Sequence, residues 1–408
     1  MTSNTAVYVI AEAGVNHNGD RQRAFELVDA AANAGADAVK FQTFNAKRLA
    51  ALTAPKAAYQ QRTTEASQSQ LEMLEALELP LEWHAPLQAH AHRRGIEFLS
   101  TAFETQSLAF LETLDLPFYK VPSGELTNGP LLWAFAQTGR PLVISTGMAT
   151  LSEVEQGLAV VCHGLSQVQP PSSLSEVWQC WSKPDARAAL SGRVSLLHCT
   201  SQYPTPLDEV NLRAMDTLAE VFGLPVGYSD HTQGTLIPVA AVARGATIIE
   251  KHFTLDRELP GPDHRASLEP DELTRMVQDI RAIAQALGDG QKVPQASEWD
   301  TRQAARQNLV AAAPIRRGES FTRDNLTTAR AGQGELAIAF WDRLGQVATQ
   351  DYEPGDALCN ECRSFFWALE GMPKSCLICS MLLIIEFWAS VIQSWRTGVF
   401  PSGGVSRC

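Results

Sequence analysis

The sequence predicts an α/β protein built on a (β/α)8 TIM barrel, followed by a small, mostly β C-terminal domain. Eight short apolar runs each end in small or polar residues, and helical patterns with apolar residues at helical spacing lie between them. Most of these runs follow one another at the length of one strand–helix unit. Eight alternating units over roughly 290 residues have the size of such a barrel.

The eight predicted strands come in chain order, and two of the connections between them are long. The strands cover residues 8–16, 36–43, 96–103, 117–125, 141–148, 194–203, 225–232 and 246–254. We expect insertions in the long connections, around residues 56–70 and 164–190. An open, doubly wound sheet is the alternative fold, but no glycine-rich dinucleotide-binding loop follows the first strand.

The pattern changes near Pro294, which separates the predicted domains. We expect the barrel to cover residues 1–290 and the small β domain to cover residues 300–358. Residues 359–408 differ from both, because they hold five of the eight cysteines and a long apolar run. Four of those cysteines have a spacing close to that of a zinc ribbon, Cys359, Cys362, Cys376 and Cys379. The usual knuckle glycines are missing, so we expect this tail not to belong to the fold.

Composition excludes some classes of function. The net charge is −12, which argues against nucleic-acid binding because phosphate recognition needs a basic face. The apolar stretch 377–392 contains Glu386 and is short for a membrane span, so we expect no membrane insertion. The N-terminus lacks the charged and apolar regions of a secretory signal, and only three cysteines precede residue 359. Both features favour a reducing cytoplasm.

Polar side chains gather at the carboxyl ends of the predicted strands, where barrel enzymes form their active sites. Lys40 and Lys120 stand there among several hydroxyl groups, a combination that suits a phosphate or carboxylate ligand. The alternative is that each lysine pairs with a glutamate, for which Glu12 and Glu125 are the candidates. So many polar groups in a barrel lumen would be costly unless they pair or bind a ligand.

His231 and His252 end adjacent predicted strands, so their rings can converge. Two imidazoles with open coordination positions suit a divalent ion such as Mn²⁺, Zn²⁺ or Fe²⁺. The alternative for each histidine is structural packing. His198 lies within an apolar run and is expected to pack in the core, whereas His84, His90 and His92 fall on one predicted helix and are expected to be solvated.

Eight motifs, in order, give the chain a family resemblance. They read IAEAGVNHNGD, AVKFQTF, KVPSGE, ISTGM, LLHCTSQYPTP, GYSDHT, EKHFTLDRELPGPDH and ASLEPDEL. Over residues 7–358 the chain resembles the sialic acid synthases, which condense phosphoenolpyruvate with N-acetylmannosamine or a related amino sugar. The predicted small β domain is similar to the antifreeze-like (SAF) domain of that family.

The resemblance implies roles for individual residues. His231 and His252 match the metal ligands, usually of Mn²⁺, with Mg²⁺ or Co²⁺ as alternatives. The phosphoenolpyruvate pocket corresponds to Lys40, Thr101, Lys120, Ser123, Ser145, Ser201 and Ser229, of which Ser201 stands where some bacterial members have asparagine. Positions near the amino sugar correspond to Glu12, Gln42, Tyr203 and Asp263. Glu125 lies near the reacting centre, where Lys120 and the two histidines also act. Arg330 matches an arginine that the SAF domain lends to the partner's site, which implies a domain-swapped homodimer.

The activity expected first is that of an N-acetylneuraminate synthase, which joins phosphoenolpyruvate to N-acetylmannosamine and releases phosphate. The alternative is N,N'-diacetyllegionaminate synthase, whose substrate is 2,4-diacetamido-2,4,6-trideoxymannose. Residues 56–74 resemble the corresponding stretch of such synthases. Two other hypotheses stay open: a Schiff-base aldolase with Lys40 or Lys120 as nucleophile, and a carbohydrate-binding protein without catalytic activity.

Overall fold

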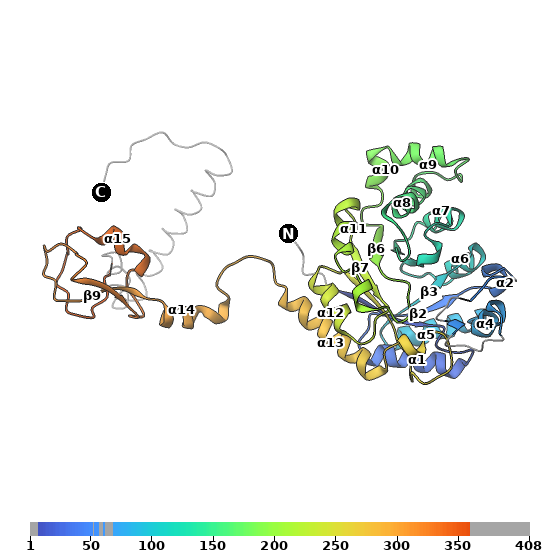
Figure 1. Cartoon of the computed structure of the whole chain (residues 1–408), viewed down its shortest axis with the longest axis horizontal. Coiled ribbons are helices and arrows are strands. Elements are labelled where there is room, and N and C mark those ends of the chain that lie inside the picture. The colour runs from blue at the N-terminus through green and yellow to red at the C-terminus, as the bar shows by residue number, and fades with distance from the viewer. Residues whose placement is uncertain (1–6, 52, 57–59, 62–67, 360–408) are drawn as a thin grey trace, which may run out of the picture. The chain divides into compact units, whose positions relative to one another are not determined.

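The computed structural model of the chain describes residues 7–51, 53–56, 60–61 and 68–359. The chain divides into two compact units, Met1–Gln291 and Lys292–Cys408 (Figure 1). Most of the tail 359–408 lies outside the described residues, including three of its four zinc-ribbon cysteines. Cys359 is described, and it is an exposed free thiol.

The first unit is a parallel eight-stranded sheet in the order β3-β2-β1-β8-β7-β6-β5-β4. Contacts between β3 and β4 bring its two edges together, so the sheet forms a nearly closed barrel. This arrangement confirms the predicted barrel, and all eight strands lie within the predicted ranges. The strands are β1 (Tyr8–Gly14), β2 (Ala38–Thr43), β3 (Glu97–Ala102), β4 (Tyr119–Val121), β5 (Leu142–Ser145), β6 (Val194–His198), β7 (Val226–Asp230) and β8 (Ile248–His252).

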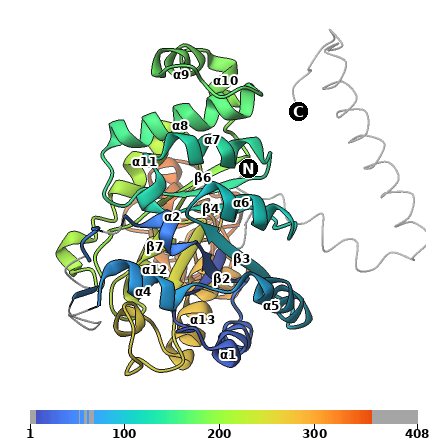
Figure 2. The ribbon, with the colours of Figure 1, turned by 90° about the vertical axis from the view of Figure 1, so that its right-hand side faces the viewer.

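Helices cover the outside of the sheet, as Figure 2 shows. The first, α1 (Arg21–Asn33), begins where the Asp20 carboxylate accepts a hydrogen bond from the Arg23 amide, and its apolar residues at helical spacing face the sheet. The other helices that follow strands are α5 (Leu81–Arg93), α6 (Thr105–Glu112), α7 (Gly129–Gln137), α8 (Leu151–Ser166), α11 (Ala214–Phe222), α12 (Leu236–Ala243) and α13 (Pro270–Ala286).

Both predicted insertions contain helices. The connection from β2 to β3 includes α2 (Ala46–Leu49) and α4 (Gln70–Leu77), which contact each other. The connection from β5 to β6 continues beyond α8 into α9 (Leu174–Trp181) and α10 (Pro184–Ala188), and both of these pack on α8. The two insertions therefore occupy different parts of the barrel unit (Figure 2).

The barrel lumen is apolar at the amino-terminal ends of strands β1 to β3. There Ile10, Ala38 and Leu99 are buried against one another. Because successive strand residues point to opposite faces, the residues two and four positions farther along these strands also face the lumen. Four of those positions are polar (Glu12, Lys40, Gln42 and Thr101), so the lumen at the carboxyl ends of the strands is the natural place for a site.

Alternate residues of β8 face opposite sides of the sheet, so neighbouring residues in this strand have different roles. Glu250 and His252 face the lumen, whereas Lys251 faces the surrounding helices. The Lys251 ammonium lies 2.5 Å from the Asp230 carboxylate, and both side chains are fully buried. Lys251 also donates to the Thr232 carbonyl oxygen, and Thr232 donates to Asp230. This ion pair ties β7 to β8 outside the lumen.

The histidines of α5 correct one expectation. His84 is fully buried rather than solvated, with its Nε2 2.7 Å from the Thr43 hydroxyl. Burial lowers the pKa of His84 to about 4, so the ring is neutral at pH 7. His90 is half-buried beside Asp29, and His92 is exposed.

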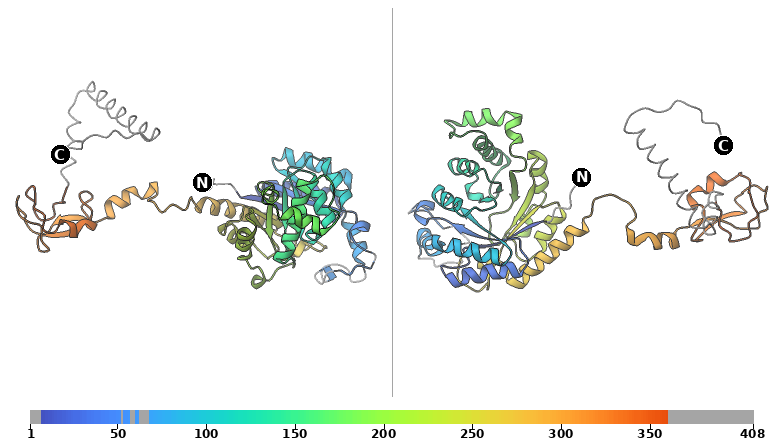
Figure 3. Two further views of the ribbon diagram at one scale, coloured as in Figure 1. Left: turned by 90° about the horizontal axis from the view of Figure 1, so that it is seen from above. Right: turned by 180° about the vertical axis from the view of Figure 1, so that it is seen from behind.

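The second unit contains α14 (Trp299–Ala305) and an antiparallel pair, β9 (Asn308–Ala311) and β10 (Leu326–Ala329), with α15 (Phe340–Arg343) later in the chain (Figure 3). Isolated bridges such as Ile315–Tyr352 supplement this pair. Its small core consists of Leu309, Ala311, Ile315, Phe321, Leu326, Ala348, Tyr352 and Leu358. Across the described part of the chain, every helix is too short or too polar to span a membrane.

Candidate active site

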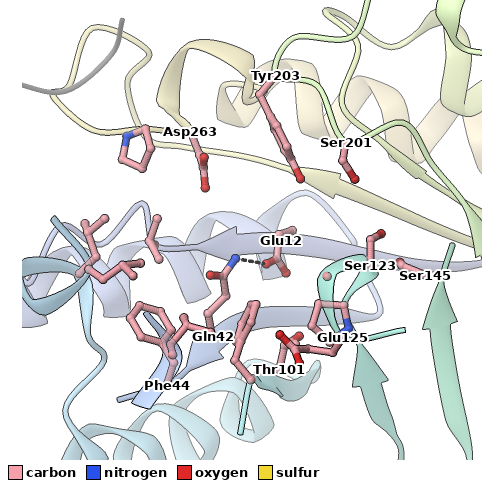
Figure 4. A pocket seen from close by; sticks show the side chains of 18 of the residues that line it. Glu12, Gln42, Phe44, Thr101, Ser123, Glu125, Ser145, Ser201, Tyr203 and Asp263 are labelled. Atoms are coloured by element: carbon pink, nitrogen blue, oxygen red, sulfur yellow. Dashed lines mark hydrogen bonds between the residues drawn. The ribbon is translucent and has the colours of Figure 1, made fainter. Parts of the chain in front are cut away.

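A pocket of about 530 Å³ opens at the carboxyl ends of the barrel strands. Its lining contains every sequence-predicted site residue except Arg330. Figure 4 shows part of this lining. Those residues are Glu12, Lys40, Gln42, Thr101, Lys120, Ser123, Glu125, Ser145, Ser201, Tyr203, Ser229, His231, His252 and Asp263. Arg330 follows β10 in the second unit, where it is exposed.

Two lysines and two glutamates form a buried charge cluster in the lumen. Lys40 lies 2.5 Å from the Glu12 carboxylate and 3.5 Å from that of Glu250, and it donates to the Thr101 hydroxyl at 3.0 Å. Lys120 lies 3.2 Å from the other oxygen of Glu250. Both lysines therefore have carboxylate partners, as one of the sequence hypotheses expected, but Glu250 is the partner that it did not name.

Glu125 was the expected partner and makes a different contact. It ends the short 3₁₀ turn Ser123–Glu125, and its carboxylate accepts a hydrogen bond from the Asn128 amide at 2.6 Å. Asn128 in turn caps the start of α7. Glu125 is thus held at the pocket wall by the helix that follows it, and among the described residues it has no lysine partner.

The two buried glutamates have opposite pKa shifts. Burial disfavours ionisation of Glu250, but Lys120 and Lys40 outweigh it, and a 2.8 Å hydrogen bond from Ser229 helps, so its pKa is lowered. Burial also raises the pKa of Glu12, to about 7; Lys40 opposes the shift and Glu250 adds to it. Glu12 is therefore the carboxyl of this cluster that can exchange a proton near neutral pH.

Hydroxyl and thiol groups line the pocket beside the lysines. Ser123 Oγ accepts a hydrogen bond from the Gly147 amide at 3.1 Å and lies 3.2 Å from the Cys199 sulfur. A Cβ at Gly147 would lie 2.4 Å from Ser201 Oγ, so the close approach of these groups requires glycine there. The Ser145 hydroxyl is buried and has no hydrogen-bond partner among the described residues. Such clustered donors suit an anionic ligand.

The rings of His231 and His252 converge, with centroids 5.7 Å apart. His231 Nδ1 lies 2.7 Å from the Thr200 carbonyl oxygen, so this nitrogen carries the proton and Nε2 keeps its lone pair. His252 Nδ1 is buried without a hydrogen-bond partner among the described residues. Burial lowers the pKa of both rings, and His231 lowers that of His252 further. Neutral imidazoles with available lone pairs fit a divalent cation.

No third His, Cys, Asp or Glu joins this pair in a metal-site arrangement within the described residues. Water or substrate oxygens would therefore complete the coordination of any bound ion, which is the open kind of site that Lewis-acid catalysis uses. The Tyr203 ring lies beside both imidazoles, with centroids 4.2 Å from His231 and 5.8 Å from His252.

Three further predicted residues surround the same space. Asp263 and Tyr203 face Gln42 across the pocket (Figure 4). Burial raises the pKa of Asp263 to about 6. The Gln42 amide donates to Glu12 at 3.4 Å, which links this part of the pocket to the charge cluster.

Glu250 and Cys199 are polar lining residues in the lumen to which the sequence had assigned no role, and Gln60 and Gln70 of the insertion are two more in the pocket lining. Glu250 lies two residues before His252 on β8, and this shared parity is the signal that places it in the lumen. Cys199 follows β6 at the parity of Leu197 and could have been found in the same way. His198 lies outside the pocket lining. Its Nε2 atom is 2.9 Å from the Val210 carbonyl oxygen, which agrees with the packing role expected for this residue.

Comparison with known proteins places the chain in a family. Residues 27–292 match the model of the NeuB family. The chain is 45% identical to N,N'-diacetyllegionaminic acid synthase of Campylobacter jejuni, with 86% of this chain and 98% of that protein covered. The chain belongs to the NeuB family. It is also 46% identical to N,N'-diacetyllegionaminic acid synthase of Legionella pneumophila, with 87% and 94% covered.

A solved structure of this family has the same architecture. The crystal structure of N-acetylneuraminic acid (sialic acid) synthetase from Leptospira borgpetersenii in complex with citrate aligns with a TM-score of 0.60 at 33% identity, covering 73% of this chain and 91% of that one. These findings confirm the resemblance to sialic acid synthases. The protein is an enzyme of the NeuB family of sugar-acid synthases.

Proposed function

We propose that this enzyme condenses phosphoenolpyruvate with 2,4-diacetamido-2,4,6-trideoxymannose to form N,N'-diacetyllegionaminic acid and phosphate. The observation that carries the reaction class is one pocket that holds two buried lysines beside two neutral, convergent imidazoles. The choice of sugar rests on identities of 45% and 46% to two legionaminic acid synthases, against 33% to the sialic acid synthetase. The proposed synthesis of N,N'-diacetyllegionaminic acid replaces N-acetylneuraminate synthesis, which was the activity expected first from the sequence.

His231 and His252 would hold a divalent cation, Mn²⁺ in the first instance with Mg²⁺ or Co²⁺ as alternatives, which supplies the Lewis acidity that polarises the sugar aldehyde. Lys40 and Lys120 would face the phosphate and carboxylate of phosphoenolpyruvate, with Ser123 and Ser145 as further donors. These four groups come from β2, β4, the turn after β4 and β5, so the barrel holds them in place without ligand.

The reaction forms one carbon–carbon bond and breaks one carbon–oxygen bond. C3 of phosphoenolpyruvate attacks C1 of the open-chain sugar, and the aldehyde oxygen takes a proton that Glu12, with a pKa of about 7, can supply. Water then adds at C2 and loses a proton to Glu125. Exchange with solvent afterwards removes that proton from Glu125 and returns one to Glu12, so both carboxyl groups are restored for the next turnover. The bond between C2 and the phosphate oxygen then breaks, and the phosphate takes the proton of the hydroxyl group on C2. C2 becomes the carbonyl carbon of the keto acid.

The Schiff-base alternative requires a neutral lysine as nucleophile. Burial would favour a neutral Lys40, but Glu12 and Glu250 outweigh burial, and the pKa of Lys40 is raised. Lys120 is held by Glu250 at 3.2 Å. Charged, paired amines are suited to binding anions and not to attack on a carbonyl, so the condensation is the better assignment.

We also propose a subunit arrangement and a cellular location for the enzyme. By its resemblance, the second unit is an SAF-type domain whose Arg330 reaches the pocket of the partner subunit in a swapped homodimer. We place the enzyme in the cytoplasm, where the buried thiols Cys162, Cys180 and Cys199 stay reduced.

The decisive assay supplies phosphoenolpyruvate, Mn²⁺ and either 2,4-diacetamido-2,4,6-trideoxymannose or N-acetylmannosamine, and follows phosphate release and the keto acid by mass spectrometry. We expect kcat/KM to be at least about tenfold higher for the diacetamido sugar. Equal or higher kcat/KM for N-acetylmannosamine would overturn the choice of sugar. No phosphate with any N-acylated mannosamine would overturn the reaction itself.

A further inference from the structure

One end of the active-site pocket is apolar, in contrast to the lysine end. The side chains there form what we call the apolar wall, which consists of Val15, Phe44, Leu49, Met73, Leu74 and Phe103. They belong to a hydrophobic cluster of their own, separate from the main core around the barrel. A wall of this kind favours a ligand with apolar groups, because polar substituents placed against it would lose their hydration.

The wall is built from three strand ends and the insertion between β2 and β3. Phe44 follows β2 and Phe103 follows β3, and their rings meet edge to face at 5.9 Å. Met73 and Leu74 lie on α4, whose start is fixed by a capping box in which Ser69 and Glu72 exchange hydrogen bonds. The wall is therefore held in shape without a ligand.

A hydrogen bond connects the two insertion helices that carry part of the wall. The Glu78 carboxylate, just after α4, accepts a 2.6 Å hydrogen bond from the Ala46 amide at the start of α2. Leu49 on α2 and Leu74 on α4 are both partly buried and both line the pocket. Phe103 is the third partly buried member of the wall, but it follows a barrel strand, whereas the two leucines lie on the insertion helices and can be substituted without altering a strand end.

Position in the pocket relates the wall to the substrate. Figure 4 shows Phe44 at the end opposite Ser123 and Ser145, with Gln42 and Glu12 between them. If phosphoenolpyruvate occupies the lysine and serine end, the sugar extends from the histidines toward Phe44. The part of the sugar farthest from its reacting C1 atom then lies against the wall.

We propose that the apolar wall is the specificity determinant for the sugar, receiving the C6 methyl group and the methyl of the 4-acetamido group. The inference rests on the proposed function and adds the residues that would select its substrate. Gln70, one turn before Leu74 on α4, also lines the pocket and offers an amide to the amide of the 4-acetamido group. N-acetylmannosamine carries hydroxyl groups at both C4 and C6, and the wall offers neither a hydrogen-bond partner.

Chemistry of the substrate provides the most direct test. Purified full-length enzyme with Mn²⁺ and phosphoenolpyruvate is assayed with 2,4-diacetamido-2,4,6-trideoxymannose and with its 6-hydroxy analogue, 2,4-diacetamido-2,4-dideoxymannose. An apolar pocket discriminates against an added hydroxyl by about a hundredfold at most, and we expect kcat/KM to be about 10- to 100-fold higher for the 6-deoxy sugar. This comparison uses the wild-type chain and needs no variant to fold.

A variant then assigns the discrimination to the wall. Leu74→Asn places an amide beside the 6-hydroxyl, and we expect the ratio of the two kcat/KM values to fall about tenfold while KM for phosphoenolpyruvate is unchanged. Leu49→Asn serves as a second variant if Leu74→Asn fails to fold. Leu236→Asn, at a 70% exposed leucine on α12 outside the pocket lining, is the matched control and should keep the wild-type ratio.

The outcomes separate the inference from the function on which it rests. Turnover of both diacetamido sugars with equal kcat/KM values in the wild type would overturn the role of the wall alone. An unchanged ratio in a folded, active Leu74→Asn and Leu49→Asn would do the same. Absence of turnover with either diacetamido sugar, alongside turnover of N-acetylmannosamine, would overturn the proposed function together with the inference.

Discussion

Glu250→Gln tests whether the buried lysines are poised for an anion. In the free enzyme Glu250 contacts Lys40, Lys120 and Ser229, and its side chain is almost fully buried. The substitution keeps the shape of the side chain and removes its charge, so Glu12 alone remains to neutralise two ammonium groups. We expect the free variant to be destabilised and its affinity for phosphoenolpyruvate to rise, because the ligand supplies the missing negative charge.

The magnitude follows from the burial of the pair. Removing one partner of a buried ion pair costs about 3–5 kcal/mol in the free energy of unfolding. For a unit of this size, 1 kcal/mol corresponds to about 2–4 °C, so we expect Tm to fall by roughly 6–20 °C. A ligand at 100 times its Kd adds about 2.7 kcal/mol to a folded protein. Because its Kd falls in the variant, a fixed concentration of phosphoenolpyruvate should raise Tm more in Glu250→Gln than in the wild type.

The assay is thermal unfolding followed by circular dichroism, in a buffer without phosphate or carboxylate, with and without phosphoenolpyruvate. Glu258→Gln, at an exposed glutamate, is the matched control and should unfold like the wild type. Equal Tm values for Glu250→Gln and the wild type without ligand would refute the idea that Glu250 neutralises the lysines. A smaller ligand-induced rise in the variant would refute the idea that they then bind the anion.

Glu250→Gln should also lower the pKa of Glu12. Glu250 contributes to the raised pKa of Glu12, so its neutralisation should move that pKa below about 7. A carboxyl group with a raised pKa binds its proton more tightly in the folded state, so protonating Glu12 stabilises the fold as pH falls from about 7 toward its ordinary pKa near 4.3. In Glu250→Gln this stabilisation should begin at lower pH, which the pH dependence of Tm measures.

Three further substitutions probe single contacts. His252→Ala should abolish turnover and weaken Mn²⁺ binding measured by calorimetry without substrates; unchanged Mn²⁺ affinity would remove His252 from the metal site. Lys251→Met leaves Asp230 without its buried partner, so unfolding should require about 3–5 kcal/mol less while KM for phosphoenolpyruvate is unchanged, and a change in KM would contradict its placement outside the lumen. Arg330→Ala should lose activity alone and regain it in mixed dimers with an inactive His252→Ala subunit; absence of regained activity would argue against a swapped arm.

Strand periodicity explains why so much of the pocket was predictable. A residue near the carboxyl end of a barrel strand faces either the lumen or the helices, and two-residue spacing decides which. Lys40 and Gln42 share one face of β2, and Glu250 and His252 share one face of β8. The partners within the lumen were harder to predict, because whether Lys120 meets Glu125 or Glu250 depends on distances between strands that no local pattern contains.

The helical histidines show a prediction that closer use of the same periodicity would have corrected. His84 lies three residues before Leu87 and seven before Ala91, and these three residues form the buried face of α5. His90 and His92 fall outside that stripe. Histidine is a polar residue, which suggested that His84 is exposed to solvent, but its spacing from Leu87 and Ala91 places it on the buried face. The Thr43 hydroxyl provides a hydrogen-bond partner for the buried ring. The apolar wall was unpredictable for another reason: its members come from four separate segments that meet only in the folded barrel.

The three consecutive residues Glu250, Lys251 and His252 at the end of β8 have different roles. All three are buried and polar, and composition alone would assign them to one site. Parity divides them instead, since Glu250 holds the lysines and His252 meets His231, while Lys251 ties β7 to β8 through Asp230. Loss of Lys251 should therefore reduce stability with catalysis intact, and loss of His252 should do the reverse. If both variants lost the same property, residue parity on β8 would not be what separates ligand binding from structural support in this barrel.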